Sequence, residues 1–219
     1  MKKASLVVLI SGSGSNLQAI IDAIKDNQLN AEIKAVISNR VTAKGLDRAA
    51  KENISTHVID HKQYSSREMF DKAMMRVIDH ENPELVILAG FMRILSNRFI
   101  DHYQHRLLNI HPSLLPRYKG INTHQQALKN NDTVHGASVH YVGRELDSGP
   151  VVIQAEVPVL ANDTVETLAA RVLKEEHKIY PMAIKMHLDN RISFNNNQIQ
   201  LDNQTLLKPL LWKNNKLNQ

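Results

Sequence analysis

The sequence has no cysteine and few aromatic residues. Without cysteine the chain cannot form a disulfide, a cysteine-based zinc site or a cysteine nucleophile. A chain without cysteine fits a reducing compartment, so we expect a cytoplasmic protein. Aromatic residues make up 5% of the chain, and no stretch interleaves them with basic residues as a surface that stacks nucleic-acid bases does.

Long apolar runs are missing as well. The longest extends from Leu85 to Met92, far short of the roughly 20 residues that a membrane span needs. At the N-terminus two lysines precede an apolar run from Leu6 to Ile10, which is too short for a secretory signal peptide and suits a buried strand. We therefore expect no membrane partner.

Neither sign of charge dominates the sequence. The chain has 27 lysines and arginines against 22 aspartates and glutamates, a formal net charge of +5. The basic residues are scattered apart from short pairs such as Lys2-Lys3. We expect no nucleic-acid partner, and instead a mildly basic surface that attracts small anionic substrates. Apolar residues make up 42% of the chain, an ordinary share for a globular protein with a real core.

The 11 histidines raise the question of a metal site. His57 and His61 are four residues apart, but they straddle the end of a predicted strand instead of sharing a helix face. The sequence contains no H-E-x-x-H motif and no set of cysteine and histidine ligands. We therefore expect no protein-bound metal.

Strand-like and helix-like segments alternate along the first half of the chain. The pattern predicts strands at residues 5–11, 31–38, 56–60, 84–89 and 106–110, and helices at 15–27, 42–53, 65–80 and 96–103. The strand at 84–89 is continuously apolar, as expected when both of its faces are covered. This alternation indicates an open parallel sheet with helices on both faces.

The alternation changes after residue 111. The pattern predicts a helix at 122–129, strands at 137–142 and 151–158, a long helix from 163 to about 187, and a hairpin around 195–197. Two pairs have the spacing of a capping box, Ser65 with Glu68 and Asp163 with Glu166. The chain reads as one domain with an appended C-terminal segment, whose polar end we expect to be frayed.

Residues 11–16 read SGSGSN and lie between a predicted strand and a predicted helix. Glycines there let backbone N–H groups approach a ligand, and a helix N-terminus favours an anion such as phosphate. The dinucleotide-binding fingerprint needs glycine where this chain has Leu17, and the Gly-Lys-Ser/Thr of a P-loop is absent. The serine-hydrolase elbow fails because residue 16 is asparagine. The alternative is a structural turn.

Residues 109–112 read NIHP at the end of a predicted strand. Asn109 and His111 project to the same face because side chains alternate, and Pro112 favours an extended backbone at His111. The carboxyl ends of parallel strands are where open α/β sheets bind ligands. An amide and an imidazole together suit the stabilisation of an oxyanion and a proton transfer. The alternative is a histidine that only caps a loop.

Two more stretches carry candidate site residues. Residues 145–150 read ELDSGP, and Asp147 either caps its own turn or pairs with His111, because a carboxylate stabilises imidazolium and raises the pKa of a histidine. Residues 89–95 read AGFMRIL, with Phe91 and Met92 just past a strand end. These two side chains either pack in the core or lie beside a flat aromatic ligand.

Four stretches together resemble one family: ISGSGSNLQAII, NIHPSLLPRYKG, HGASVHYV followed by ELDSGP, and EHKIYP. They are similar to the phosphoribosylglycinamide formyltransferases, folate-dependent enzymes of purine synthesis, from about Ser5 to near Leu201. The resemblance implies an α/β fold with a mostly parallel seven-stranded open sheet, a Rossmann-like N-terminal half, helices on both faces and a small C-terminal hairpin. It implies a formyltransferase domain at 1–190, divided near 105 into a nucleotide-binding half and a folate and catalytic half, and a hairpin with a frayed tail at 191–219.

The resemblance also implies a reaction and a site. A formyl group passes from the co-substrate 10-formyltetrahydrofolate to the amine of glycinamide ribonucleotide, in de novo purine biosynthesis and without a metal. The implied catalytic residues are Asn109, His111 and Asp147. The implied contacts to glycinamide ribonucleotide are Gly14, Ser15, Asn16 and Glu176. The implied folate contacts are Arg67, Met92, Arg93, Ile94, Leu95, Gly143, Arg144, Glu145, Leu146 and Asp147.

In the implied mechanism the glycinamide amine attacks the formyl carbon. Asn109 and protonated His111 stabilise the oxyanion, while Asp147 orients His111 and keeps it charged. A proton reaches N10 of the folate through water. The resemblance further implies a cis Leu115–Pro116 bond that leaves His111 facing the cleft. We expect two small-molecule substrates and a monomer or homodimer.

Three alternatives remain at this point. Methionyl-tRNA formyltransferase shares the reaction but usually has a further C-terminal domain, where this chain has about 30 residues, most of them polar. Formyltetrahydrofolate hydrolase usually has an N-terminal regulatory domain, whereas this chain starts directly on its first predicted strand. A non-catalytic anion-binding module explains residues 12–16 and the positive charge, but it does not explain why Asn109, His111 and Asp147 occur together.

Overall fold

The computed structural model describes residues 2–196 and 198–218 of the chain. They form two compact units, one with the residues up to Asn109 and one with the residues from Ile110 onward. The boundary falls within the strand β5 (Leu107–His111). The predicted domain at 1–190, its two halves and the separate segment at 191–219 stay predictions.

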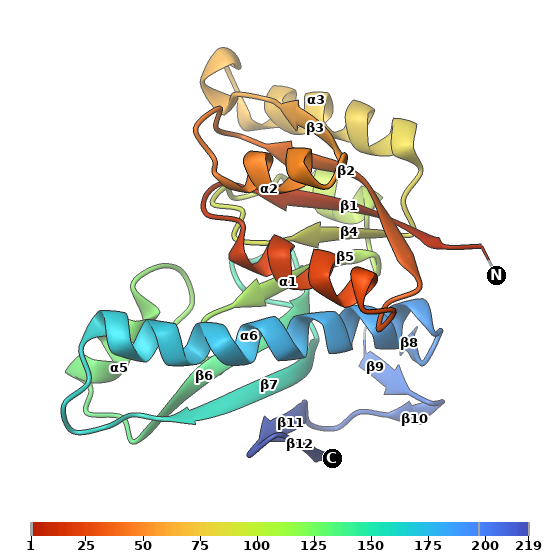
Figure 1. Cartoon of the computed structure of the whole chain (residues 1–219). Coiled ribbons are helices and arrows are strands. Elements are labelled where there is room, and N and C mark those ends of the chain that lie inside the picture. The colour runs from red at the N-terminus through yellow and green to blue at the C-terminus, as the bar shows by residue number, and fades with distance from the viewer. Residues whose placement is uncertain (1, 197, 219) are drawn as a thin grey trace. The chain divides into compact units, whose positions relative to one another are not determined.

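Five strands form a parallel sheet in the first unit. They are β1 (Ala4–Ile10), β2 (Ala31–Ser38), β3 (Ser55–Val58), β4 (Leu85–Leu88) and the first residues of β5. Their order is β3-β2-β1-β4-β5, and each neighbouring pair is parallel (Figure 1). The apolar run at 84–89 forms the inner strand β4, which is buried along its whole length as the sequence predicts.

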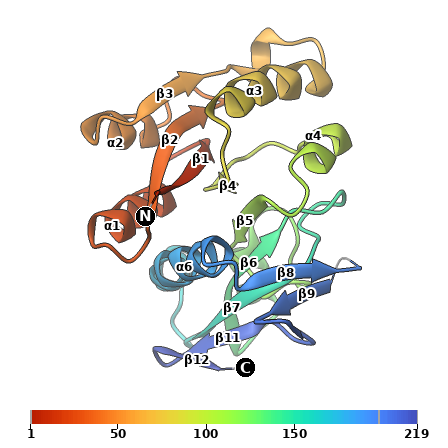
Figure 2. The same ribbon diagram turned by 90° about the vertical axis from the view of Figure 1, so that its right-hand side faces the viewer.

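Helices cover both faces of this sheet. They are α1 (Ser15–Lys25), α2 (Gly45–Lys51), α3 (Arg67–Glu81) and α4 (Asn97–His102), with a short 3₁₀ helix at His61–Gln63. Figure 2 shows α1 and α2 on one face, and α3 and α4 on the other. This division follows from right-handed crossovers, because the chain moves outward from β1 to β3 and then returns to β4 on the other side of β1. The prediction of an α/β fold with a mostly parallel sheet and helices on both faces is confirmed.

The reversal of strand order between β1 and β4 positions two loops. β1 and β4 are parallel neighbours, so the loop at 11–16 and the segment at 89–95 both leave the carboxyl edge of the sheet side by side. Open α/β sheets bind their ligands at such a point, since the two connections leave in opposite directions and open a crevice.

The second unit is built around an antiparallel pair of strands. α5 (Thr123–Lys129) precedes β6 (Val134–Tyr141) and β7 (Val151–Pro158), and the long helix α6 (Val165–Leu188) packs on both strands (Figure 1). An antiparallel sheet follows, with β8 (Ile192–Asn195), β9 (Gln198–Leu201) and β10 (Gln204–Thr205). This confirms the predicted hairpin, although Asn197 lies outside the described residues.

The C-terminal tail departs from the prediction. Instead of a frayed end, β11 (Leu210–Lys213) pairs parallel to β7 and β12 (Lys216–Asn218) pairs with β11, so these strands add to the predicted seven. Leu210 is buried, Trp212 Nε1 donates to Glu175 Oε2 at 2.7 Å, and Lys213 pairs with Glu156. These contacts hold a segment whose polar composition alone indicates disorder.

Helix starts differ from the predicted ones by a few residues. α2 begins at Gly45 instead of at residue 42. The N-caps of α3 and α6 are Ser66 and Thr164, one residue later than the predicted Ser65 and Asp163. For α6 the capping box joins Thr164 to Thr167, and the Asp163 carboxylate instead accepts hydrogen bonds from Arg171. The Thr164 hydroxyl therefore caps α6, because the Asp163 carboxylate is already bound by Arg171.

Among the described residues, no helix has the length and apolar character that crossing a membrane requires.

Candidate active site

The loop at 12–16 leads from β1 into α1. Gly14 is the N-cap of α1 in the left-handed region, at φ +70°, and the first turn of the helix holds the uncharged residues Ser15 and Asn16. α2 supports the loop from one side: Gly45 N donates to Gly12 O at 3.1 Å, and Arg48 Nε donates to Ser13 O at 2.9 Å. The arrangement leaves a helix N-terminus with its positive dipole end available for an anion.

Gly14 has no room for a side chain. A Cβ placed on it would lie 2.5 Å from the Cα atom of Gly45, and its positive φ disfavours any other residue. Gly12 differs, since nothing lies within 4 Å of a Cβ at that position. The close packing of Gly14 on Gly45 therefore sets the path of the backbone around the first turn of α1.

The predicted folate contacts of the first unit lie on α3 and on the segment at 92–95. Arg67 is the first residue of α3 and is exposed. Met92, Arg93 and Ile94 are exposed as well, whereas Leu95 is buried and anchors the segment. Three exposed neighbours, two of them apolar, are consistent with a surface that receives a ligand.

His111 is buried in the second unit, with 5% of its surface exposed. Its Nε2 lies 2.8 Å from the carbonyl oxygen of Tyr118, and its Nδ1 lies 3.5 Å from Asp147 Oδ2. A carbonyl and a carboxylate are both acceptors, and neutral imidazole has only one N–H to donate. The Nε2 atom therefore donates to the Tyr118 carbonyl, and the Asp147 carboxylate lies on the other side of the ring.

Asp147 reaches His111 because its own loop is tight. Gly143 N donates to Ser148 O at 2.8 Å and Ser148 Oγ donates to Glu145 O at 2.7 Å. Asp147 itself adopts a positive φ of 44°, and its Oδ2 also accepts from Gly120 N at 2.7 Å. The structure thus confirms that Asp147 and His111 lie together, which the sequence left open.

The Leu115–Pro116 bond is cis, as predicted. That His111 faces the cleft stays a prediction. Ser113 Oγ donates to Arg117 O at 2.6 Å within this turn, and the Tyr118 carbonyl lies against His111 Nε2. Sequence reasoning missed Tyr118 and Gly120, because a backbone group leaves no signal in residue type.

The remaining predicted residues are placed as follows. Asn109 lies on β5 beside Leu88 of β4, two residues before His111 on the same strand. Glu176 lies on α6 and is buried. Arg144, Glu145 and Leu146 are exposed.

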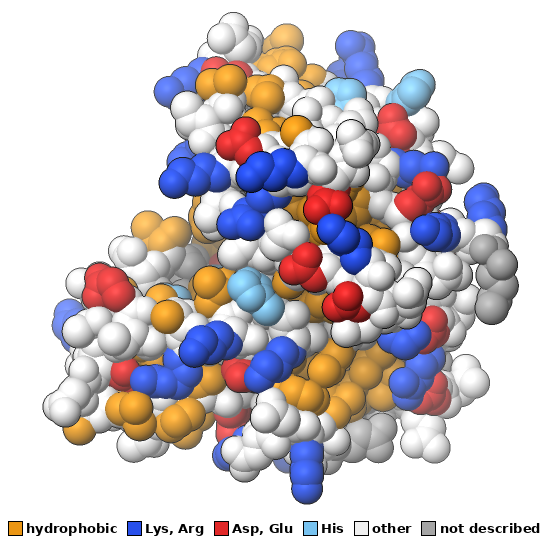
Figure 3. Space-filling model, in the orientation of Figure 1, with side chains coloured by type: hydrophobic (Ala, Val, Ile, Leu, Met, Phe, Trp, Pro, Cys, Tyr) orange, Lys and Arg blue, Asp and Glu red, His pale blue; other side chains and the backbone are white. Residues whose placement is uncertain are grey.

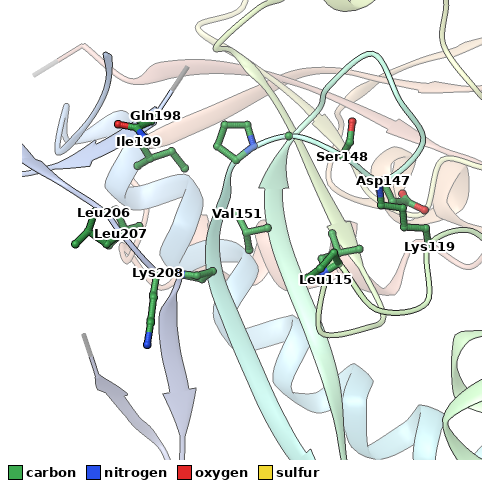
Figure 4. A pocket seen from close by; sticks show the side chains of 14 residues that line it. Leu115, Lys119, Asp147, Ser148, Val151, Gln198, Ile199, Leu206, Leu207 and Lys208 are labelled. Carbon is green, nitrogen blue, oxygen red and sulfur yellow. The ribbon is translucent and has the colours of Figure 1, made fainter. Parts of the chain in front are cut away.

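A cavity of about 500 Å³ lies beside Asp147, between the loop at 147–151, the turn at 115–119 and the C-terminal segments (Figure 4). Figure 4 shows Lys119 close to Asp147, with Ile199, Leu206 and Lys208 on the opposite side. Among the described residues, Gly143 to Leu146 do not line this cavity. Of the predicted folate contacts of this loop, Asp147 therefore lines the cavity and the other four do not.

A second histidine pair lies near the catalytic candidates. His124 Nδ1 and His135 Nε2 are 3.1 Å apart, and the Tyr118 ring lies against His135. Burial is the main reason that the pKa of His135 falls to about 4, and it also lowers the pKa of His124. Two neutral imidazoles can share one N–H···N hydrogen bond, as this distance requires. No motif or spacing in the sequence groups these two histidines.

Metal and nucleic-acid binding find no support in the parts of the chain that are described. No group of three or more histidine, cysteine, aspartate and glutamate side chains could hold a metal ion there. His57 and His61, the pair that the sequence already disfavoured, belong to no such group, and His61 Nδ1 lies 3.2 Å from Asn39 O. Figure 3 shows basic and acidic side chains interspersed on the visible face.

Comparison with known proteins identifies the family. A family model described as formyl transferase matches residues 4–184. The phosphoribosylglycinamide formyltransferase of Escherichia coli (strain K12) is 52% identical over 202 residues, which cover 92% of this chain and 95% of that protein. The chain belongs to the phosphoribosylglycinamide formyltransferase family. The resemblance seen in the sequence is thereby confirmed.

Solved structures agree with this membership. The phosphoribosylglycinamide formyltransferase from Coxiella burnetii matches with a TM-score of 0.90 and 50% identity, over 93% of this chain and 96% of that one. A formyltetrahydrofolate deformylase from Pseudomonas syringae has a TM-score of 0.84 but only 26% identity, and this chain covers 66% of it. The deformylase shares the fold, while the formyltransferases share both fold and sequence. The non-catalytic alternative is also disfavoured, since the chain is a formyl-transferring enzyme of purine biosynthesis.

The low pKa of His135 predicts how stability changes with pH. The pKa of an unfolded histidine is about 6.5, so between about pH 6.5 and 4 the unfolded chain binds more protons than the folded one. Through His135, the free energy of unfolding is therefore unaffected above about pH 6.5 and decreases as the pH falls toward 4. The variant His135→Gln should lose less stability over this window, as measured by urea unfolding at pH 7 and pH 4.5. His80→Gln, at an exposed histidine, is the control. Equal acid sensitivity of H135Q and the unchanged protein would contradict a buried neutral His135.

Proposed function

We propose that Asn109, His111 and Asp147 carry out the formyl transfer that defines the family. In this reaction 10-formyltetrahydrofolate, the co-substrate, gives its formyl group to the amine of glycinamide ribonucleotide. The products are formylglycinamide ribonucleotide and tetrahydrofolate. The observation that carries the assignment is the His111 ring, which has the Asp147 carboxylate at Nδ1 and the Tyr118 carbonyl at Nε2.

This arrangement suits a developing oxyanion. When the amine attacks the formyl carbon, negative charge grows on the formyl oxygen, and a charged N–H donor stabilises it more in the transition state than in the ground state. The Tyr118 carbonyl holds the Nε2 proton in the absence of substrate. In the reaction the formyl oxygen takes the place of that carbonyl, so the turn at 115–119 must release His111 before chemistry.

Asn109 and Asp147 assist in different ways. Asn109 is two residues before His111 on β5, so strand alternation puts both side chains on the same side of the strand. Its amide supplies a second donor to the oxyanion. The Asp147 carboxylate, 3.5 Å from Nδ1, orients the ring and stabilises its charged form, while Gly120 N donates to this carboxylate and holds it in place. The proton lost by the amine passes to N10 of the folate through water.

The two substrates are held by separate sets of residues. The phosphate of glycinamide ribonucleotide binds the backbone N–H groups of Gly14, Ser15 and Asn16 at the start of α1, and Glu176 contacts the nucleotide. The folate contacts Arg67, the segment Met92 to Leu95, and the loop Gly143 to Asp147. Positioning the amine and the formyl carbon together turns a bimolecular reaction into an effectively unimolecular one.

The enzyme acts on small molecules, and we place it in the cytoplasm as a monomer or homodimer. The absence of cysteine fits a reducing compartment.

Replacing Asp147 tests the charged histidine. Asp147→Asn keeps the shape of the side chain but cannot stabilise imidazolium, so we expect kcat to fall about 100-fold or more with an unchanged thermal unfolding midpoint. The matched control Asp189→Asn changes an exposed carboxylate on the last turn region of α6 and should leave kcat intact. Near-normal turnover of D147N at neutral pH would show that the pairing with His111 has no catalytic part.

Replacing Gly14 tests the phosphate loop. Gly14→Ala forces a Cβ against Gly45, so the backbone N–H groups must shift and KM for glycinamide ribonucleotide should rise about tenfold or more. KM for 10-formyltetrahydrofolate should change less than about twofold on the same reasoning. Gly12→Ala, where the added Cβ meets open space, is the control and should behave like the unchanged protein. Equal rises in both KM values of G14A would contradict the assignment of this loop.

A further inference from the structure

The segment at 92–95 has no regular structure of its own, yet both of its ends are tied to buried side chains. It joins β4 to α4, and its exposed residues Met92 to Ile94 lie between the buried Phe91 and Leu95. A loop of this kind keeps one conformation only when other parts of the chain fix its backbone. Two side chains from distant positions in the sequence do so here.

The first tie comes from β1. Met92 N donates to Ser11 Oγ at 2.8 Å, and the same hydroxyl donates to Asn39 Oδ1 at 2.5 Å. Ser11 and Asn39 are both buried, so the hydroxyl is held between a donor and an acceptor with little freedom to turn. Ser11 immediately precedes the loop at 12–16, which makes it a direct link between that loop and the segment at 92–95.

The second tie comes from α3. Ser96 N donates to Asp71 Oδ2 at 2.6 Å, and Asp71 is 1% exposed. Burial raises the pKa of the Asp71 carboxyl, and the hydrogen bonds from Ser96 lower it by a smaller amount. Burying a carboxyl costs stability unless it gains partners, so its place inside the unit points to a role for the contact with Ser96.

Asp71 also lies one helical turn after Arg67 on α3. Residues four apart share a face of a helix, and the charge of Arg67 acts on the Asp71 carboxyl. The helix that carries one predicted folate contact therefore also holds the end of the segment that carries four others. A change in the Asp71 contact shifts the segment relative to Arg67.

We propose that Asp71 and Ser11 are positioning residues for the folate site, which hold the two ends of the segment Met92 to Leu95 without touching the folate. The inference rests on the proposed folate contacts of this segment. Asp71 sets the distance between the segment and Arg67, and Ser11 sets its distance from the phosphate loop. Loss of either tie weakens folate binding, while the chemistry at His111 continues once the folate is bound.

The test compares two carboxylates on the same helix. Asp71→Ala removes the acceptor for Ser96 N, and we expect KM for 10-formyltetrahydrofolate to rise about tenfold, the loss of one hydrogen bond to a charged group. KM for glycinamide ribonucleotide and kcat should each stay within about threefold. Asp71→Asn keeps an acceptor oxygen and should restore the folate KM. Isothermal titration with tetrahydrofolate should give the same ranking.

Asp79→Ala is the matched control. Asp79 lies two turns after Asp71 and also connects α3 to the α4 region, accepting from Tyr103 Oη at 2.8 Å and contacting His102 Nε2 at 3.0 Å. Its loss should lower the thermal unfolding midpoint without changing the folate KM. A folate KM that rises equally in D79A and D71A would reduce Asp71 to a general structural contact and overturn the proposal.

Variants at Ser96 and Ser11 test the two ties independently of D71A. If D71A does not fold, Ser96→Pro removes the donor from the other side, since the φ of −73° at Ser96 fits proline, and Ser96→Ala keeps the N–H as its control. S96A loses the Ser96 hydroxyl, which bonds Asp71 and caps α4, and S96P loses the N–H as well, so S96P should raise the folate KM clearly above that of S96A. Ser11→Ala should raise the folate KM as D71A does. An unchanged folate KM in D71A, or in S96P where D71A is unfolded, overturns the role of Asp71, and an unchanged KM in S11A overturns that of Ser11.

One variant separates this inference from the proposed function. Ile94→Asp changes the segment itself. A raised folate KM in I94D with a normal one in D71A keeps the folate contacts and overturns the positioning role. A normal folate KM in I94D removes the folate contacts of the segment, and the positioning inference is then overturned with them.

Discussion

The candidate site is organised around one ring held between two acceptors. His111 is buried with a carboxylate near one nitrogen and a backbone carbonyl at the other. Asp147 lies in the tight loop at 143–149, the Tyr118 carbonyl lies in the turn at 115–119, and His111 lies at the end of β5. A charged donor kept out of water is the group that a developing oxyanion needs most, because its field is weakly screened there.

In the first unit a single topological feature brings together the two segments that we propose contact the substrates. β1 and β4 are parallel neighbours from which the chain leaves in opposite directions, so the loop at 11–16 and the segment at 92–95 start at one edge. Gly14 packs on Gly45 to shape the first, while Ser11 and Asp71 hold the second. Short buried hydrogen bonds thus fix the chain beyond the ends of the strands, where the regular backbone pairing of the sheet stops.

Much of the fold could be predicted from sequence because its signals are local and repeated. Apolar strands such as β4 and amphipathic helices such as α1 can each be recognised from a short stretch of consecutive residues. The ordered tail could not be predicted, since it depends on partners such as Glu175 and Glu156 that are distant in sequence. The same holds at the site. Residue types indicated Asn109, His111 and Asp147, but the Tyr118 carbonyl and the Gly120 N–H belong to the backbone, and a backbone group is present at every position.

The protonation state of His111 is the most direct test of the central claim. Labelling the protein with ¹⁵N-histidine allows the two ring nitrogens of His111 to be observed separately by long-range proton–nitrogen correlation spectra, with a His111→Ala sample to assign them. We expect Nε2 of His111 to carry a proton in the folded, substrate-free enzyme, donated to the Tyr118 carbonyl, and the Nδ1 signal to change in Asp147→Asn. A spectrum of the folded protein in which Nε2 is unprotonated, or in which D147N leaves the Nδ1 signal unchanged, would contradict this arrangement.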